Sequence, residues 1–212
     1  MAQIQIDIIQ HHCAESAGEI LHWAQSRNIK LQVYRADLAQ LPASNDLPCI
    51  ILGGPYSALG NEEWLSAERA WLSAKINTNA KIFAICLGAQ LLALATGAQV
   101  KKMYAPESGW SSVHLSDASS LDVMTWHEDQ FSLPPSGQPA ARNEKCLQMF
   151  RLPKDRVGVQ FHPEWNAESV ATLNNYCGVA SPLPREIDAE RFAAVSAWLY
   201  QQLDDWLEIN SN

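Results

Sequence analysis

One cysteine stands where a thiol could do chemistry. Cys86 divides the apolar run 81–100, KIFAICLGAQLLALATGAQV, into a strand-like piece before it and a helix-like piece after it. A thiol on a sharp strand–turn–helix connection projects above a parallel sheet, and the small residues Ala84 and Gly88 allow strand and helix to approach closely. The helix N-terminus would lower the pKa of the thiol, and the N–H of Leu87 could donate to an oxyanion. Buried free cysteines are most often packing residues, so a nucleophile requires a partner base.

A histidine and a carboxylate follow a second strand-like segment. His162 and Glu164 come directly after VGVQF at 157–161, and Pro163 between them favours extended geometry. Because residues i and i+2 of an extended segment share a face, Glu164 can orient the imidazole and stabilise its protonated form. The spacing supports two interpretations, a structural His-Pro-Glu turn or the base and orienter of a nucleophilic thiol.

Two glycines follow a third strand-like segment, PCIIL at 48–52. Backbone N–H groups at Gly53 and Gly54 could face a substrate carbonyl and complete an oxyanion hole with Leu87. A plain Gly-Gly-Pro turn is the alternative interpretation. Gln90, one turn into the helix after the cysteine, could line the same pocket.

Composition narrows the class of protein. The chain has 212 residues, 47% of them hydrophobic, and a formal net charge of −8 with no basic cluster beyond Lys101-Lys102, which argues against nucleic-acid binding. The five cysteines form no CxxC pair, and adjacent residues such as His11-His12-Cys13 rarely point at one ion, so we expect no disulfide framework, no metal and no cofactor. The N-terminus does not resemble a secretory signal, and Gly and Gln interrupt the apolar run 83–100. We therefore expect a cytoplasmic protein with no membrane span.

The elements that must position these residues alternate between strand and helix over the first hundred residues. This alternation predicts an open, mostly parallel sheet with helices on both faces. The expected strands are 4–8, 31–34, 48–52 and 81–85, and the expected helices are 14–27, 61–75 (with Asn61 as its cap) and 87–96. Later strand-like pieces at 100–103, 111–115, 146–152 and 157–161 are broken by Pro, Gly and Ser, which predicts added antiparallel hairpins. Two helices, within about 167–206, would pack on a single domain spanning 1–212, with an apolar stripe of the last one in the core.

Several segments together resemble a known family. They are ICLGAQLLA around Cys86, GGPYS at 53–57, VQFHPEW at 159–165, PESGW at 106–110 and WHEDQFSLPP at 126–135. In this order they resemble the class I, Cys-His-Glu triad glutamine amidotransferases, and in particular stand-alone members similar to the amidotransferase domain of GMP synthase. The resemblance covers roughly residues 45–165.

The resemblance implies a flavodoxin-like α/β fold and a reaction on the side-chain amide of glutamine. Cys86 would attack the amide, His162 would act as base and then as acid toward the leaving ammonia, and Glu164 would orient His162. The N–H groups of Gly54 and Leu87 would hold the oxyanion, and the glutamyl thioester would then be hydrolysed.

The resemblance also implies three residues that contact the substrate, and two other residues of the chain depart from the family pattern. Gly53, Gln90 and His127 would line the substrate pocket. Ala84 stands where the family usually has glycine, so one methyl group crowds the turn. Glu128 replaces a residue that is usually small, which changes the charge near the pocket.

Three functions remain open at this point. No synthase motif or GxxxxGK[ST] loop occurs in the sequence, so an amidotransferase would pass ammonia to a separate synthase chain or would act as a glutaminase. A γ-glutamyl peptide hydrolase would use the same triad on a different leaving group. A non-catalytic binding or regulatory protein could keep the fold without the reaction.

Overall fold

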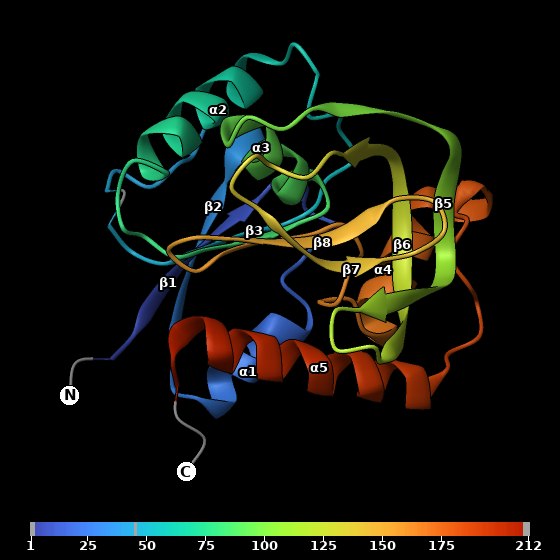
Figure 1. Ribbon diagram of the computed structural model, residues 1–212. Coiled ribbons are helices and arrows are strands. Elements are labelled where there is room, and N and C mark those ends of the chain that lie inside the picture. The colour runs from blue at the N-terminus through green and yellow to red at the C-terminus, as the bar shows by residue number, and fades with distance from the viewer. Residues whose placement is uncertain (1–2, 45, 210–212) are drawn as a thin grey trace.

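The centre of the computed structural model, which describes residues 3–44 and 46–209, is a mixed sheet of nine strands (Figure 1). Their order is β2-β1-β3-β4-β9-β8-β7-β5-β6. The strands are β1 (Gln5–Gln10), β2 (Lys30–Arg35), β3 (Cys49–Ile51), β4 (Ile82–Ile85), β5 (Val100–Leu115), β6 (Ser120–Phe131), β7 (Gln138–Arg142), β8 (Leu147–Leu152) and β9 (Arg156–Val159). Neighbours from β2 to β9 pair in parallel, and the pairs from β9 to β6 are antiparallel. The predicted α/β architecture with an antiparallel addition is confirmed.

Helices cover both faces of this sheet. They are α1 (Glu19–Ser26), α2 (Glu63–Lys75), α3 (Leu87–Ala95), α4 (Ala167–Cys177) and α5 (Ala189–Leu207), with short 3-10 turns η1 (Ala36–Leu38) and η2 (Gly178–Ala180). Figure 1 shows α2 and α3 above the parallel strands and α1 and α5 below them. Among the described residues, no helix has the length and apolar character that crossing a bilayer requires.

The central strands are buried on both faces, which explains their continuous apolar runs. Ile50 of β3 packs in the cluster that contains α1 and α5 residues, whereas Ile51 packs in the cluster of α2 and α3. Each of these fully buried side chains contributes roughly 1.5–3 kcal/mol relative to an exposed one. The two clusters hold the strands in register, so their carboxyl ends form one edge.

The predicted stripe of α5 faces the core. Leu199 and Leu203 are fully buried, and Phe192, Val195 and Trp206 nearly so.

The antiparallel half differs most from the prediction. Residues 104–110, expected to lie between two short strands, belong to the single long strand β5, which bends where its pairing with β6 shifts between Lys102 and Glu107. Strand β6 was not expected, because its buried positions at 125, 127 and 129 carry polar side chains. Strand β7 was missed because it is short and contains Pro139, a residue that argues against a strand. Its pairing with β8 is irregular on either side of Ala141.

Two helix starts also differ. Helix α1 begins at Glu19 instead of residue 14, because Gly18 has φ +47° and the Glu19 N–H bonds to the Glu164 carbonyl at 2.8 Å. A Cβ at Gly18 would lie 2.0 Å from that carbonyl oxygen, so glycine is required there. Helix α2 is not capped by Asn61: its N-cap is Glu62, which makes no side-chain cap bond.

Candidate active site

Cys86 lies on the turn between β4 and α3. Its φ is 49° and its ψ is −108°, an uncommon conformation for a residue with a side chain, which costs roughly 1–3 kcal/mol. The turn is held by a hydrogen bond from the Cys86 N–H to the Val159 carbonyl at 2.7 Å. Gly88 permits the close approach, because a Cβ there would lie 2.4 Å from the Ile51 carbonyl oxygen. The predicted strained turn is therefore present, and the methyl of Ala84, fully buried in β4, does not prevent it.

His162 and Glu164 lie beyond the end of β9, which pairs with β4. His162 Nδ1 donates to Glu164 Oε1 at 2.8 Å, and the ring stacks on Trp165 with centroids 3.7 Å apart. All three side chains are buried. Because Nδ1 is bound to the carboxylate, Nε2 is the ring nitrogen that remains for Cys86, whose side chain lines the same cavity as His162.

The charge of His162 follows from these contacts. Burial alone would lower its pKa, but the Glu164 carboxylate and the Cys86 side chain outweigh burial, so the pKa of His162 lies well above its usual 6.5. The structure thus brings the three predicted residues together at one edge of the sheet.

A cavity of about 330 Å³ opens at this edge of the sheet. Predicted residues in its wall are Cys86, His162, Gly54, Leu87, Gln90 and His127. Two predicted residues lie behind the wall: Glu164 supports His162, and Gly53 has its carbonyl turned toward His11.

His11 and Glu68 form a buried pair beneath Gly53. Both side chains are fully buried, and His11 Nε2 lies 3.0 Å from each carboxylate oxygen of Glu68. His11 Nδ1 lies 2.9 Å from the Gly53 carbonyl oxygen. The Gly53 carbonyl can only accept, so Nδ1 carries a hydrogen, and Glu68 favours a second hydrogen on Nε2. Burial alone would lower the pKa of His11, but the charge and hydrogen bonds of Glu68 raise it.

This contact sets the direction of one peptide plane. In a trans peptide the C=O and N–H point in opposite directions. Since His11 holds the Gly53 carbonyl on one side, the N–H of Gly54 points to the other side. A side chain at Gly54 would meet His11, because a Cβ there would lie 2.7 Å from the His11 Cβ.

Glu15 is a carboxylate of the site that sequence reasoning missed. It lines the cavity, and its Oε2 atom is buried without a hydrogen-bond partner among the described residues. Burial raises the pKa of Glu15, His162 opposes this rise and Glu164 adds to it. The position of Glu15 in the chain could have indicated its role. Residues 11–15 follow β1, whose carboxyl end lies beside that of β3, and sites form at this edge of a parallel sheet.

One glutamine and one carbonyl lie near the Cys86 sulfur, and a second glutamine contacts the first. Gln160 Nε2 lies 3.7 Å from Sγ, and the Trp126 carbonyl oxygen lies 3.9 Å from it. Gln90 Nε2 donates to the Asp129 carbonyl at 3.3 Å and lies 3.4 Å from Gln160 Oε1. Gln90 thus supports the cavity wall from inside the helix.

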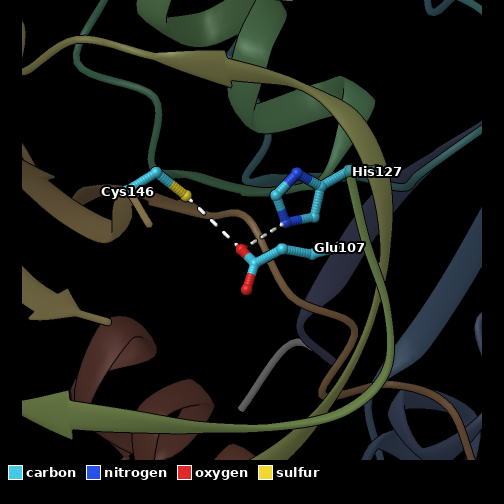
Figure 2. Close-up of side chains that lie close together, drawn as sticks. All are labelled: Glu107, His127 and Cys146. Atoms are coloured by element: carbon cyan, nitrogen blue, oxygen red, sulfur yellow. Dashed lines mark hydrogen bonds and ion pairs between the residues drawn. The ribbon is translucent and has the colours of Figure 1, made fainter. Parts of the chain in front are cut away.

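His127 belongs to a buried polar cluster behind the cavity (Figure 2). Its Nε2 lies 3.2 Å from Glu107 Oε2, and Cys146 Sγ lies 3.6 Å from the same oxygen. Burial would raise the pKa of Glu107, but His127, Asn143 and Lys145 lower it to about 2, so this carboxylate is ionised.

Glu128, which like Ala84 departs from the family pattern, is exposed. It pairs with Lys102 at 3.1 Å, at the rim of the cavity.

Comparisons with known proteins identify the family of this chain. The family described as "Glutamine amidotransferase class-I" matches residues 15–172. The chain belongs to the class I glutamine amidotransferase family. The glutamine amidotransferase-like protein YfeJ of Salmonella typhimurium is 26% identical over 96% of this chain and 94% of its own.

Further similar proteins either match a shorter part of the sequence or are similar in structure. One subunit of the glutamine-hydrolysing GMP synthase of Sulfurisphaera tokodaii is 34% identical over 56% of this chain and 68% of its own. A crystal structure of a glutamine amidotransferase from Methylobacillus flagellatus superimposes with a TM-score of 0.87, at 25% identity, over 98% of this chain and 95% of that one. The resemblance predicted from the motifs is confirmed. Glu15 opens the part that matches the amidotransferase family, whereas His11 precedes it.

Proposed function

We propose that this protein hydrolyses the side-chain amide of glutamine through a thioester on Cys86 and supplies the ammonia to a separate synthase chain. The observation that carries the proposal is that a carboxylate-held imidazole, His162, and a thiol on a strained turn, Cys86, line one cavity. This is the arrangement of an activated nucleophile with its base and orienter.

The first half-reaction forms the thioester. The Cys86 sulfur bonds to the amide carbon of glutamine while its proton passes to His162. Collapse of the tetrahedral intermediate breaks the C–N bond, and His162 returns the proton to the leaving nitrogen, which departs as ammonia. Glu164 stabilises the imidazolium between these two transfers.

The second half-reaction regenerates the thiol. His162 takes a proton from water, the hydroxide bonds to the thioester carbon, and the C–S bond breaks to give glutamate. The thiolate recovers its proton from His162.

The oxyanion of both intermediates is held by two backbone groups. Leu87 is the first residue of α3, so its N–H has no acceptor within the helix. The second donor is the N–H of Gly54, whose direction His11 controls through the Gly53 carbonyl. His11 is therefore a positioning residue for the oxyanion hole, and Glu68 keeps it protonated.

The remaining cavity residues hold the substrate. Gln90 and His127 line the wall beside Cys86. Glu15 presents a carboxylate to the same cavity and suits the α-ammonium group of glutamine.

The proposed ammonia acceptor rests on the relatives. Several relatives are named as one subunit of a glutamine-hydrolysing GMP synthase, which describes one part of a divided enzyme. A separate synthase chain is therefore the partner that we propose here.

A substrate panel tests the proposed function. Purified protein is incubated with glutamine, with γ-glutamyl peptides and with γ-glutamyl amines, and the release of ammonia and of amine is measured separately. We expect ammonia from glutamine. Faster release of amines than of ammonia would make the protein a γ-glutamyl peptide hydrolase, and no turnover together with no labelling of Cys86 would make it a non-catalytic member of the family.

The pKa of His162 gives a pH-dependent prediction. Because the folded-state pKa lies above the unfolded value, the interaction of charged His162 with Glu164 stabilises the fold fully below about pH 6.5 and is lost as pH rises through the raised folded pKa. We expect Glu164→Gln to lower this pKa and to destabilise the protein more at about pH 6 than above the folded pKa. NMR titration of the His162 ring and urea unfolding across this range measure both effects. An unchanged His162 pKa in the variant would contradict the assigned contact, and Glu168→Gln on α4 is a control of equal charge change.

A further inference from the structure

We propose that Glu107, His127 and Cys146 form a binding site for a zinc ion behind the wall of the active-site cavity. The inference shares His127 with the wall of the active-site cavity, but it uses no step of the amidase chemistry proposed above. The three residues come from separate parts of the antiparallel half: Glu107 on β5, His127 opposite it on β6, and Cys146 directly before β8. Figure 2 shows the Cys146 sulfur and a ring nitrogen of His127 both directed at one carboxylate oxygen of Glu107.

The donor set fits zinc among the common metal ions. An imidazole nitrogen, a sulfur and a carboxylate oxygen together suit a borderline divalent ion, whereas calcium and magnesium prefer oxygen ligands only. The remaining coordination position would be taken by water, as in sites with three protein ligands.

The spacing of the donor atoms fits a tetrahedral ion. With nitrogen and oxygen at about 2.0–2.2 Å and sulfur at about 2.3 Å, tetrahedral zinc separates its ligand atoms by about 3.3–3.7 Å. Glu107 Oε2 lies 3.2 Å from His127 Nε2 and 3.6 Å from Cys146 Sγ. All three donor atoms lie within 4.8 Å of one another, so the third edge requires a small side-chain adjustment.

The ring of His127 is oriented as a metal ligand. Its Nδ1 lies 3.0 Å from the Asp129 carbonyl oxygen, which can only accept, so Nδ1 carries a hydrogen. Nε2 then faces the Glu107 carboxylate and the Cys146 sulfur, and it makes no hydrogen bond of good geometry in the described part of the chain. A carbonyl that holds one ring nitrogen while the other faces an anionic group is the usual support of a metal-bound histidine.

The other two donors are also held from outside. Gln148 Nε2 donates to Glu107 Oε2 at 2.7 Å and lies 3.3 Å from Cys146 Sγ, and Asn143 Nδ2 donates to Glu107 Oε1 at 2.7 Å. These bonds occupy only part of the accepting capacity of the carboxylate. They fix the donor atoms before an ion binds, which reduces the cost of ordering them.

The cluster adjoins a second, open cavity. This cavity has a volume of about 270 Å³ and is lined by Glu107, Asn143 and Lys145 among others. The sequence predicted no metal because the ligands are distant in the chain and only the β5–β6 pairing and the β7–β8 connection bring them together.

The competing explanation is a metal-free ion pair between protonated His127 and Glu107, with Cys146 as a neutral neighbour. Zinc titration distinguishes the two. The protein is prepared without a tag and as Cys86→Ser, so that the thiol beside His162 cannot bind the ion, and is stripped with a chelator. We expect one equivalent of zinc to bind in competition with a chromophoric chelator.

Two matched variants locate the ion. Adding Cys146→Ser should weaken zinc binding at least about 100-fold, whereas adding Cys177→Ser, which removes a thiol on α4, should leave it unchanged. Cobalt in place of zinc should give a thiolate-to-cobalt charge-transfer band in the Cys86→Ser protein, and this measurement does not depend on the folding of the Cys146 variant. The absence of this band, or zinc binding that survives Cys146→Ser, would overturn the site in favour of the ion pair.

Discussion

Replacing Cys86 by alanine should abolish covalent labelling by a glutamine-like chloroketone and should reduce ammonia release by roughly 10⁴-fold or more. The expectation follows from the position of Cys86 and His162 in the wall of one cavity, since without sulfur neither the thioester nor the proton transfer can occur. Peptide mapping of the labelled protein and a coupled ammonia assay measure the two effects.

The other cysteines provide the controls for this experiment. Cys13 is exposed and Cys177 is partly exposed, so alanine at either position should leave labelling and activity unchanged. Label recovered on any cysteine other than Cys86, or substantial ammonia release by the alanine variant, would refute the assignment of the nucleophile.

Replacing His11 by leucine should lower both stability and activity. The variant leaves the Glu68 carboxylate buried without its partner, which costs roughly 3–5 kcal/mol of unfolding free energy. It also releases the Gly53 carbonyl, and misorientation of the Gly54 N–H should reduce kcat on the order of 100-fold. Urea unfolding and steady-state kinetics with glutamine measure the two effects.

A double variant separates the positioning role from a structural one. His11→Leu combined with Glu68→Leu replaces the whole ion pair by apolar groups, which commonly restores stability. We expect stability to recover while kcat stays low and KM changes little, because nothing then orients the Gly53–Gly54 peptide. Recovery of kcat together with stability would show that His11 serves the fold and not the oxyanion hole.

The parallel half of the fold could be predicted because its signals are local. Apolar β-branched segments that end at glycine or cysteine mark β3 and β4, and both faces of these strands are buried. The antiparallel half could not be predicted in the same way. In β6 the buried period of two runs from Val123 to Phe131, but its three central members, Thr125, His127 and Asp129, are polar.

The residues of the candidate site also differ in how well the sequence predicts them. Cys86, His162 and Glu164 each follow an apolar strand, and short spacing relates the last two residues, so the sequence suffices to connect them. His11, directly after β1, pairs with Glu68 in the middle of α2. No pattern in the sequence predicts that these two polar side chains are buried together. Glu15 was missed because the loop that carries it was expected to be helical.

The position of β9 in the sheet has a consequence for the newly made chain. This strand inserts between β4 and β8, so the segment that carries His162 is synthesised only after the whole excursion from β5 to β8. Until that segment leaves the ribosome, Cys86 has no base and its turn lacks the hydrogen bond to Val159. A chain that lacks β9 and the segment after it therefore cannot hydrolyse glutamine. The amidase activity that we propose begins only after β9 has paired with β4 and β8.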